Sequence, residues 1–205
     1  MAETVVSAIT DSLAPRARAL VARLDALDRA MVRALPRIRR RALTPVLVAV
    51  TYSGSGPVWF ASATVLASLT SVGIGDERAI RIWLACMTGS LASLVTGQLL
   101  KRGFRRTRPF DALEGHETLG LRPRDASMPS THSSTATALA VGLALAGSPW
   151  APLVAIWAAA VVFSRYYTGV HYPSDLAAGV LLGGAFGIVD YSGVVRVLLG
   201  APRLV

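Results

Sequence analysis

The sequence predicts an all-α protein: a polytopic membrane bundle of five or six transmembrane helices, with an amphipathic interfacial helix at its N-terminus. The first observation is composition, since 53% of the 205 residues are hydrophobic and only 16% are charged. Soluble domains usually carry about 25% charged residues. The second is that apolar residues form long uncharged runs, as over residues 42–75, and such runs are typical of membrane-spanning helices.

The third observation is the periodicity of a basic N-terminal segment, residues 1–41. Apolar residues recur there at steps of three and four, while nine arginines lie between Arg16 and Arg41. This pattern indicates an amphipathic helix in the membrane interface. A helix packed on the rest of the protein is the alternative. The apolar positions are Leu20, Leu24, Leu27, Met31, Leu35 and Ile38.

Residues 42–190 are predicted to form the membrane-embedded domain, and residues 191–205 a C-terminal tail. The sequence "SGSGP" at 53–57 interrupts the first uncharged run, so residues 42–55 form either a short buried helix or a doubtful sixth span. Small residues in the last span, among them Gly179 and Gly183, suit close helix packing. The five clear spans are 57–73, 82–100, 133–147, 150–163 and 176–189.

The formal charge of +9 does not indicate a nucleic-acid partner, because the basic residues cluster beside apolar spans. Such clusters report orientation and contact with anionic lipids. Residues 16–41, and seven basic residues between Lys101 and Arg124, favour the cytoplasmic side of the inner (cell) membrane. A true span within residues 42–55 would reverse this orientation. Oligomeric state is not predicted.

Three polar segments follow or precede the spans: "KRGFRRTRPF" from Lys101, "MPSTHSST" from Met128 and "SRYYTGVHYPSD" from Ser164. The spans at 133–147 and 150–163 form one hairpin, so counting crossings puts all three segments on the same side of the membrane. We therefore expect their side chains to form one site.

The cations of these segments are Lys101, Arg108 and Arg165, and three such groups suit a dianionic phosphoryl group. The two histidines, His132 and His171, suit a nucleophile and a general acid.

Asp175 follows His171 by four residues, which suits a carboxylate that holds the imidazole in one tautomer. Ser130 adds a hydroxyl. Two histidines and an aspartate could also ligate zinc, but a zinc site would not require several converging cations, so no metal is expected.

The pattern resembles the three motifs of type 2 phosphatidic acid phosphatases, also called lipid phosphate phosphatases. The resemblance covers roughly residues 55–190. The matching motifs are Lys101, six residues, Arg108-Pro109; then Pro129-Ser130-Thr131-His132; then Ser164-Arg165, five residues, His171, three residues and Asp175.

The resemblance implies a role for each residue. His171 would attack phosphorus and form a phosphohistidine, Asp175 would orient it, and His132 would protonate the leaving lipid oxygen. Thr131 stands where the family usually has Gly, and its side chain could add a phosphate hydrogen bond or narrow the pocket. The implied phosphate-binding residues are Lys101, Arg108, Ser130, Thr131 and Arg165.

The expected function is metal-independent and cofactor-free hydrolysis of a phosphomonoester or pyrophosphate on a membrane lipid. Phosphatidic acid, phosphatidylglycerol phosphate and polyprenyl phosphate or pyrophosphate all fit, and the bilayer is the expected partner. Two alternatives stay open: a membrane phosphotransferase that uses an acceptor other than water, and a non-catalytic lipid-binding module.

Overall fold

The computed structural model describes residues 2–120, 122–198 and 200, and all regular structure within them is helical. This confirms the predicted all-α class for the part of the chain described. The helices are α1 (Ala2–Arg33), α2 (Leu35–Ile38), α3 (Leu43–Ser53), α4 (Gly56–Ser71), α5 (Glu77–Phe104), α6 (Pro109–Ala112), α7 (Thr131–Leu145), α8 (Ala151–Tyr167), α9 (Pro173–Asp190) and α10 (Arg196–Leu198), with a π-helical turn at Tyr191–Val195 before α10.

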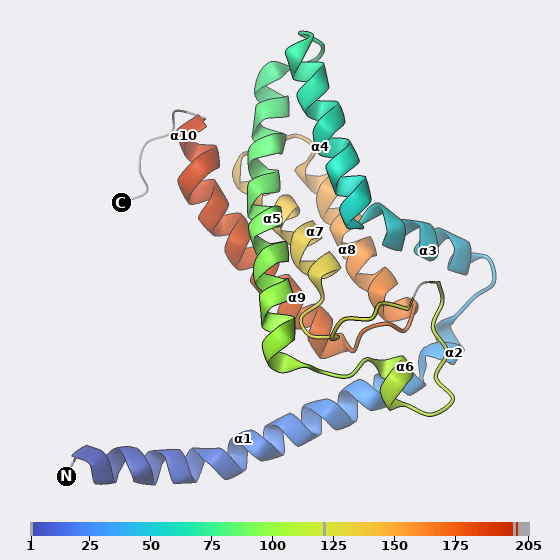
Figure 1. The fold of residues 1–205 in the computed structure, drawn as a ribbon, viewed down its shortest axis with the longest axis vertical. Helices are drawn as coiled ribbons and strands as arrows, with labels where there is room; N and C mark the ends of the chain where they lie inside the picture. Colours follow the sequence, from blue (N-terminus) through green and yellow to red (C-terminus); the bar gives the residue numbers. More distant parts are fainter. Residues whose placement is uncertain (1, 121, 199, 201–205) are drawn as a thin grey trace.

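Helices α4, α5, α7, α8 and α9 run alongside one another, and α7 lies among the others (Figure 1). Helix α7 is built almost entirely from Ala, Gly, Ser, Thr and Leu, and these small side chains let neighbouring backbones approach closely. Its Leu139 and Leu143 pack in one buried cluster with Cys86 of α5 and Val161 of α8.

A stripe of glycines on α9 brings this helix into backbone contact with α7. A Cβ on Gly179 would lie 2.5 Å from the Ser130 carbonyl oxygen, and one on Gly187 would lie 2.7 Å from the Ala138 carbonyl oxygen. Gly183, between them, meets the α7 backbone in the same way, whereas Gly184 faces open space. The predicted close packing thus belongs to one face of α9, and it fixes the N-terminal ends of α7 and α9 together.

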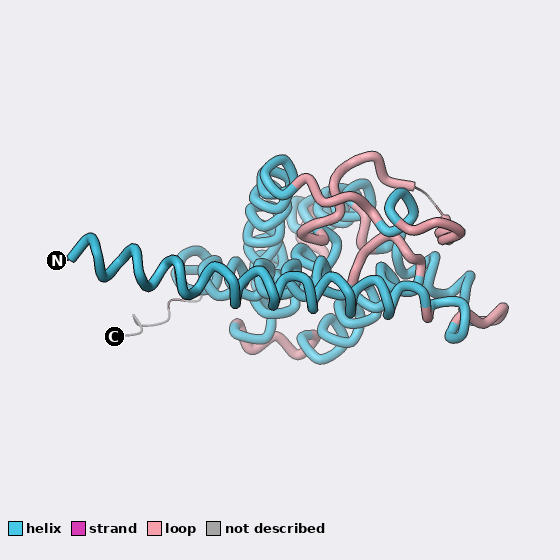
Figure 2. The backbone as a smooth tube through the Cα atoms, turned by 90° about the horizontal axis from the view of Figure 1, so that it is seen from below, coloured by secondary structure: helices cyan, strands magenta, loops and turns pink. Residues whose placement is uncertain are grey.

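Helix α1 crosses the end of the bundle at which the long loops gather (Figures 1 and 2). Val32 and Leu35 are fully buried in a small cluster with Leu113 and Tyr172. The predicted apolar stripe therefore divides, because Leu35 packs on the protein while its other members stay exposed. These exposed members are Leu20, Leu24, Leu27, Met31 and Ile38.

Two helical stretches, Glu77–Ala112 and Pro173–Val195, are long and apolar enough to cross a bilayer by length and composition. Helix α3 has 11 residues and lies at an angle to α4 (Figure 1), with the break at Gly54 and Ser55 as predicted from "SGSGP". It packs against α8, where Thr51 donates to the Ser164 hydroxyl at 2.7 Å. Of the predicted tail 191–205, the chain stays helical through Leu198, and residues 199 and 201–205 lie outside the described residues.

Candidate active site

The three polar segments meet at the end of the bundle that α1 crosses (Figure 1). Lys101 lies in the last turn of α5 and Arg165 in the last turn of α8, while His132 lies in the first turn of α7. Arg108 and His171 lie in the loops that follow α5 and α8. The structure thus brings together segments that the crossing count had placed on one side.

Arg108 and His171 form the centre of this cluster, and both side chains are almost fully buried. The Arg108 Nη1 lies 3.3 Å from His171 Nε2 and donates to the Val170 carbonyl oxygen at 2.9 Å. A guanidinium only donates, so Nε2 presents its lone pair to Arg108 and the ring proton lies on Nδ1. Burial, and then the charges of Arg108, Arg165 and Lys101, lower the pKa of His171 well below its ordinary value, which keeps the imidazole neutral.

Asp175 lies on the other side of the His171 ring. Its Oδ2 is 3.5 Å from His171 Nδ1 and accepts a 2.9 Å hydrogen bond from the Tyr172 amide. Pro173 occupies the first turn of α9, and Asp175 lies near its cap. The arrangement suits a carboxylate that stabilises positive charge on an imidazole whose Nε2 reacts.

A carboxylate that the sequence analysis did not single out, Asp125, bridges two of the cations. Its Oδ2 accepts from Lys101 Nζ at 2.5 Å and its Oδ1 from Arg108 Nη2 at 2.7 Å. Burial alone would raise the pKa of Asp125, but the hydrogen bonds and charges of Lys101 and Arg108 lower it to about 2. An anion therefore sits between these cations, as a phosphate oxygen would.

Arg165 is the third cation, and its side chain is buried. Its Nε has no hydrogen-bond partner among the described residues, and it interacts electrostatically with Arg108 and Asp125. A buried guanidinium with donors left over is well suited to receive a further anion.

Ser130 and Thr131 start helix α7. Ser130 is the N-cap residue, its Oγ accepts from the Ser133 amide at 3.4 Å, and its own amide donates to the Asp175 carbonyl oxygen at 3.0 Å. The Thr131 methyl lies 2.9 Å from the position of a Cβ on Gly97 of α5. Glycine at 97 thus makes room for a threonine at 131, and contact of either residue with phosphate stays a prediction.

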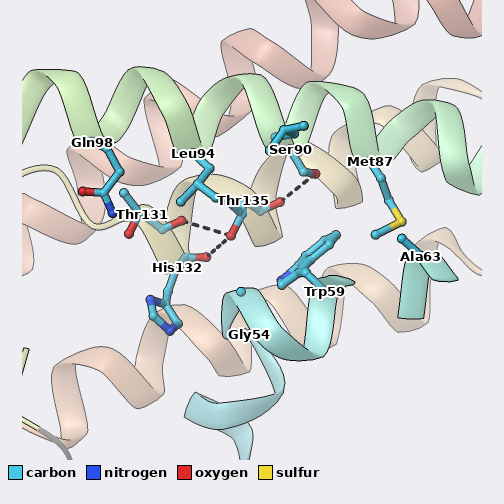
Figure 3. A pocket seen from close by; sticks show the side chains of 12 residues that line it. Gly54, Trp59, Ala63, Met87, Ser90, Leu94, Gln98, Thr131, His132 and Thr135 are labelled. Atoms are coloured by element: carbon cyan, nitrogen blue, oxygen red, sulfur yellow. Dashed lines mark hydrogen bonds between the residues drawn. The ribbon is translucent and has the colours of Figure 1, made fainter. Parts of the chain in front are cut away.

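His132 borders two cavities. The larger one, of about 400 Å³, lies between α4, α5 and α7 (Figure 3). The other, of about 320 Å³, also reaches Arg165 and Tyr52. The larger cavity is mostly apolar and leads from His132 along α5. It is lined by Gly54, Gly56, Trp59, Ala63, Met87, Ser90, Leu91, Leu94, Gln98, Thr131, His132 and Thr135.

Sequence reasoning also missed two residues, Arg106 and Asp28. Arg106 contacts Asp175 directly, and Asp28 in turn contacts Arg106. The signal for Arg106 was its place two residues before Arg108, where it was counted only as a loop charge. Asp28 offered a weaker signal, as one of few acidic residues in an arginine-rich helix. In the described residues, no group of three or more His, Cys, Asp or Glu side chains is arranged to hold a metal ion.

Comparison with known proteins agrees with the motifs. Residues 81–197 match the PAP2 superfamily. The chain belongs to this superfamily. It is 35% identical over 133 residues to the decaprenylphosphoryl-5-phosphoribose phosphatase of Mycobacterium tuberculosis, covering 63% of this chain and 70% of that protein. It is 33% identical over 108 residues to the undecaprenyl-diphosphatase of Sulfolobus acidocaldarius, covering 52% of each.

The fold agrees with that of a solved PAP2-type enzyme, the transmembrane phosphatidylglycerolphosphate phosphatase of Bacillus subtilis. The TM-score is 0.65 at 21% identity, covering 82% of this chain and 84% of that one. The family match and the phosphatases among the relatives confirm the predicted family and the predicted enzyme class, a phosphoric ester hydrolase. The structural similarity shows that this chain has the fold of that PAP2-type phosphatase.

Proposed function

We propose that this protein is a metal-independent phosphatase that removes a phosphoryl group from a membrane lipid through a phosphohistidine at His171. The observation that carries the proposal is the convergence of Lys101, Arg108 and Arg165 beside the neutral Nε2 of His171. Asp125 supports it, since its carboxylate already occupies an anion position between two of these cations.

In the first step the Nε2 lone pair of His171 forms a bond to phosphorus while the bond from phosphorus to the lipid oxygen breaks. Burial and the three cations of the site disfavour protonation of His132. The dianionic phosphate offsets the charges of these cations, so His132 can act as an imidazolium. It gives its proton to the lipid oxygen and becomes neutral, and Asp175 stabilises the positive charge on the phosphorylated imidazole. In the second step water attacks phosphorus, the P–N bond breaks, and His132 takes the proton of the water. Inorganic phosphate is one product, and the other is the lipid alcohol from a phosphomonoester or the lipid phosphate from a pyrophosphate.

The lipid tail is proposed to occupy the apolar cavity between α4, α5 and α7 (Figure 3). His132 lies at its border, where a general acid would meet the oxygen that joins tail or head group to phosphate. Because two relatives are named for decaprenyl and undecaprenyl lipids, polyprenyl-linked phosphates are the substrate class we propose first. Phosphatidic acid and phosphatidylglycerol phosphate carry the same phosphoryl chemistry and belong in the same screen.

We also propose that α1 lies in the membrane interface and that the active site faces the cytoplasm. Leu20, Leu24 and Leu27 are exposed on α1, and α1 contacts the active-site end of the bundle through Asp28. The arginines of α1 and the active site therefore share one side, which the positive-inside rule assigns to the cytoplasm. Helix α3, about 16 Å long, is too short to span alone and reverse this assignment.

The activity is tested with the purified full chain by measuring phosphate released from polyprenyl phosphate, polyprenyl pyrophosphate, phosphatidic acid and phosphatidylglycerol phosphate in detergent. We expect release from at least one of them, and labelled substrate should leave an acid-labile phosphoenzyme. Transfer to added alcohols in place of water would favour a phosphotransferase. Absence of turnover with every lipid would favour the non-catalytic module and overturn the proposal.

Orientation is tested by placing a single thiol in the loop between α6 and α7. Glu114 is exposed and Cys86 is buried, so Glu114→Cys in a Cys86→Ser background gives one accessible thiol. A membrane-impermeant thiol reagent should label it only after the cells are broken. Labelling of intact cells would show that the active site faces outward.

A further inference from the structure

The second arginine of the "RRTRP" run makes contacts that differ in kind from those of a phosphate-binding residue. Arg106 Nη1 donates to Asp175 Oδ1 and to Ser174 Oγ, each at 2.7 Å. Its guanidinium carbon lies 4.2 Å from the centroid of the Tyr172 ring, within the range of a cation–π contact. Arg106 thus contacts three of the four residues in the segment Tyr172–Asp175, namely Tyr172, Ser174 and Asp175.

The two oxygens of Asp175 divide between Arg106 and the reaction centre. Oδ1 accepts from Arg106, while Oδ2 faces His171 Nδ1 and accepts from the Tyr172 amide. Asp175 has no exposed surface, so its charge and its rotation depend on these donors. A buried carboxylate that loses a charged donor turns or takes up a proton.

The N-terminal helix completes the arrangement through Asp28, whose side chain is 5% exposed. Asp28 Oδ2 accepts from Arg106 Nη2 at 2.7 Å, and Oδ1 accepts from the Ser174 amide at 3.0 Å. The Ser174 hydroxyl also donates to Asp28. Asp28 therefore holds Arg106 and the first turn of α9 at once, from a position 146 residues earlier in the chain.

We propose that Asp28 and Arg106 are positioning residues for the reaction: α1 holds Arg106, and Arg106 holds Asp175 in the rotation in which it faces His171. Neither residue contacts the cation cluster that would bind phosphate, so they act on the chemical step rather than on substrate affinity. This inference rests on the proposed roles of His171 and Asp175. It assigns α1 a part in catalysis in addition to its proposed contact with the bilayer.

The test is Asp28→Asn in the full chain, with kcat, KM and thermal unfolding measured in detergent on the best lipid substrate. We expect kcat to fall about 10- to 100-fold, as displacement of a catalytic group by a fraction of an ångström does, while KM changes less than about threefold. Asp25→Asn is the matched control, one turn away on the same helix. Asp25 is 42% exposed, lies 3.5 Å from Arg106 and is paired with Arg29, so kcat should stay within about threefold.

A second variant covers the case in which Asp28→Asn does not fold. Ser174→Ala removes the hydroxyl between Asp28 and Arg106 but keeps both charges, and should lower kcat about 3- to 10-fold at unchanged KM. Wild-type kcat in the folded variants, or a rise of KM in step with the loss of kcat, would overturn the inference. Where His171→Ala is inactive but Asp28→Asn is not impaired, only this inference fails; where His171→Ala stays active, the proposed function fails.

Discussion

Arg106 and Arg108 lie two residues apart in the sequence, but the carboxylates that pair with them differ in solvent exposure. Arg108 faces the proposed phosphate site, and its partner Asp125 is 40% exposed. Arg106 faces away from it, toward Asp175 and Asp28, whose side chains are 0% and 5% exposed.

A carboxylate open to solvent can leave and be replaced by a stronger anion, whereas a buried one cannot leave without exposing an unpaired charge. The comparison thus predicts that Asp125 is an exchangeable counter-ion of the site. The partners of Arg106 are permanent parts of the fold.

The largest effect is expected at His171, which lies between Arg108 and Asp175. His171→Ala should lower kcat by about 10⁴-fold or more, because removal of a nucleophile costs several orders of magnitude, and the protein should remain folded and extractable. Phosphate release is the measurement. His116→Gln is the control, since the His116 ring contacts the Gly169 carbonyl oxygen at 3.0 Å and, in the described part of the chain, forms no hydrogen bond to the proposed catalytic residues. A His171→Ala variant that keeps more than about a hundredth of the wild-type rate would contradict the assignment.

The next effect concerns the exchangeable counter-ion. Asp125→Asn removes the charge that competes with phosphate for Lys101 and Arg108, so inorganic phosphate should inhibit about 3- to 10-fold more strongly, while the variant stays active. Inhibition constants measured side by side give the result. If Asp125→Asn instead weakens phosphate binding, Asp125 organises the cations rather than competes for them, and the contrast with Arg106 disappears.

A smaller effect is expected from pH. An aspartate of ordinary pKa is about half protonated near pH 4, but the pKa of Asp125 is lowered to about 2. A lowered pKa means that the contacts of Asp125 persist above its ordinary pKa and are lost only as pH falls through about 2. The difference in phosphate affinity between wild type and Asp125→Asn should therefore persist from pH 7 to pH 4. The measurement is the thermal shift that phosphate causes in each protein. Equal shifts for wild type and Asp125→Asn at pH 4 would show that Asp125 has an ordinary pKa, and would contradict the prediction.

No effect is expected from chelators, since Lys101, Arg108 and Arg165 supply the positive charge that a metal would otherwise bring. Phosphate release in EDTA should equal that in buffer, while vanadate should inhibit as a mimic of five-coordinate phosphorus. Activity that EDTA removes and zinc or magnesium restores would show that the side-chain cations are not sufficient.

The sequence predicted those site residues that belong to one short segment and can be recognised by their spacing within it. His171 with Asp175 is one such pair, and Lys101 with Arg108 is another. Counting membrane crossings then predicted that these segments meet. Asp28 could not be found in this way, because its partners lie 78 and 146 residues away and no local pattern marks a contact across the fold. Asp125 looked like one more charge in a basic loop, because its role depends on where the loop folds back.

The predicted N-terminal helix shows a further limit of periodicity. Residues at steps of three and four share a face of a helix, but the pattern does not say whether protein or lipid covers that face. Leu35 packs against Leu113 and Tyr172, while Leu24 and Leu27 stay exposed. The charge of Asp28 predicts a solvent-facing side chain, yet Asp28 is buried and paired with Arg106.

The contact between α7 and α9 has a consequence for how enzymes of this architecture diversify. Ser130 and Asp175 are joined by a backbone hydrogen bond, and Gly179 rests against the Ser130 carbonyl, so the spacing of the two histidine motifs does not depend on large side chains. The apolar cavity, in contrast, is walled mainly by side chains of α4 and α5, such as Trp59 and Leu94. Substitutions in those walls reshape the cavity without moving the reacting groups. In the proposed function, in which this cavity holds the lipid tail, such substitutions would change the preferred lipid and leave the chemistry as it is.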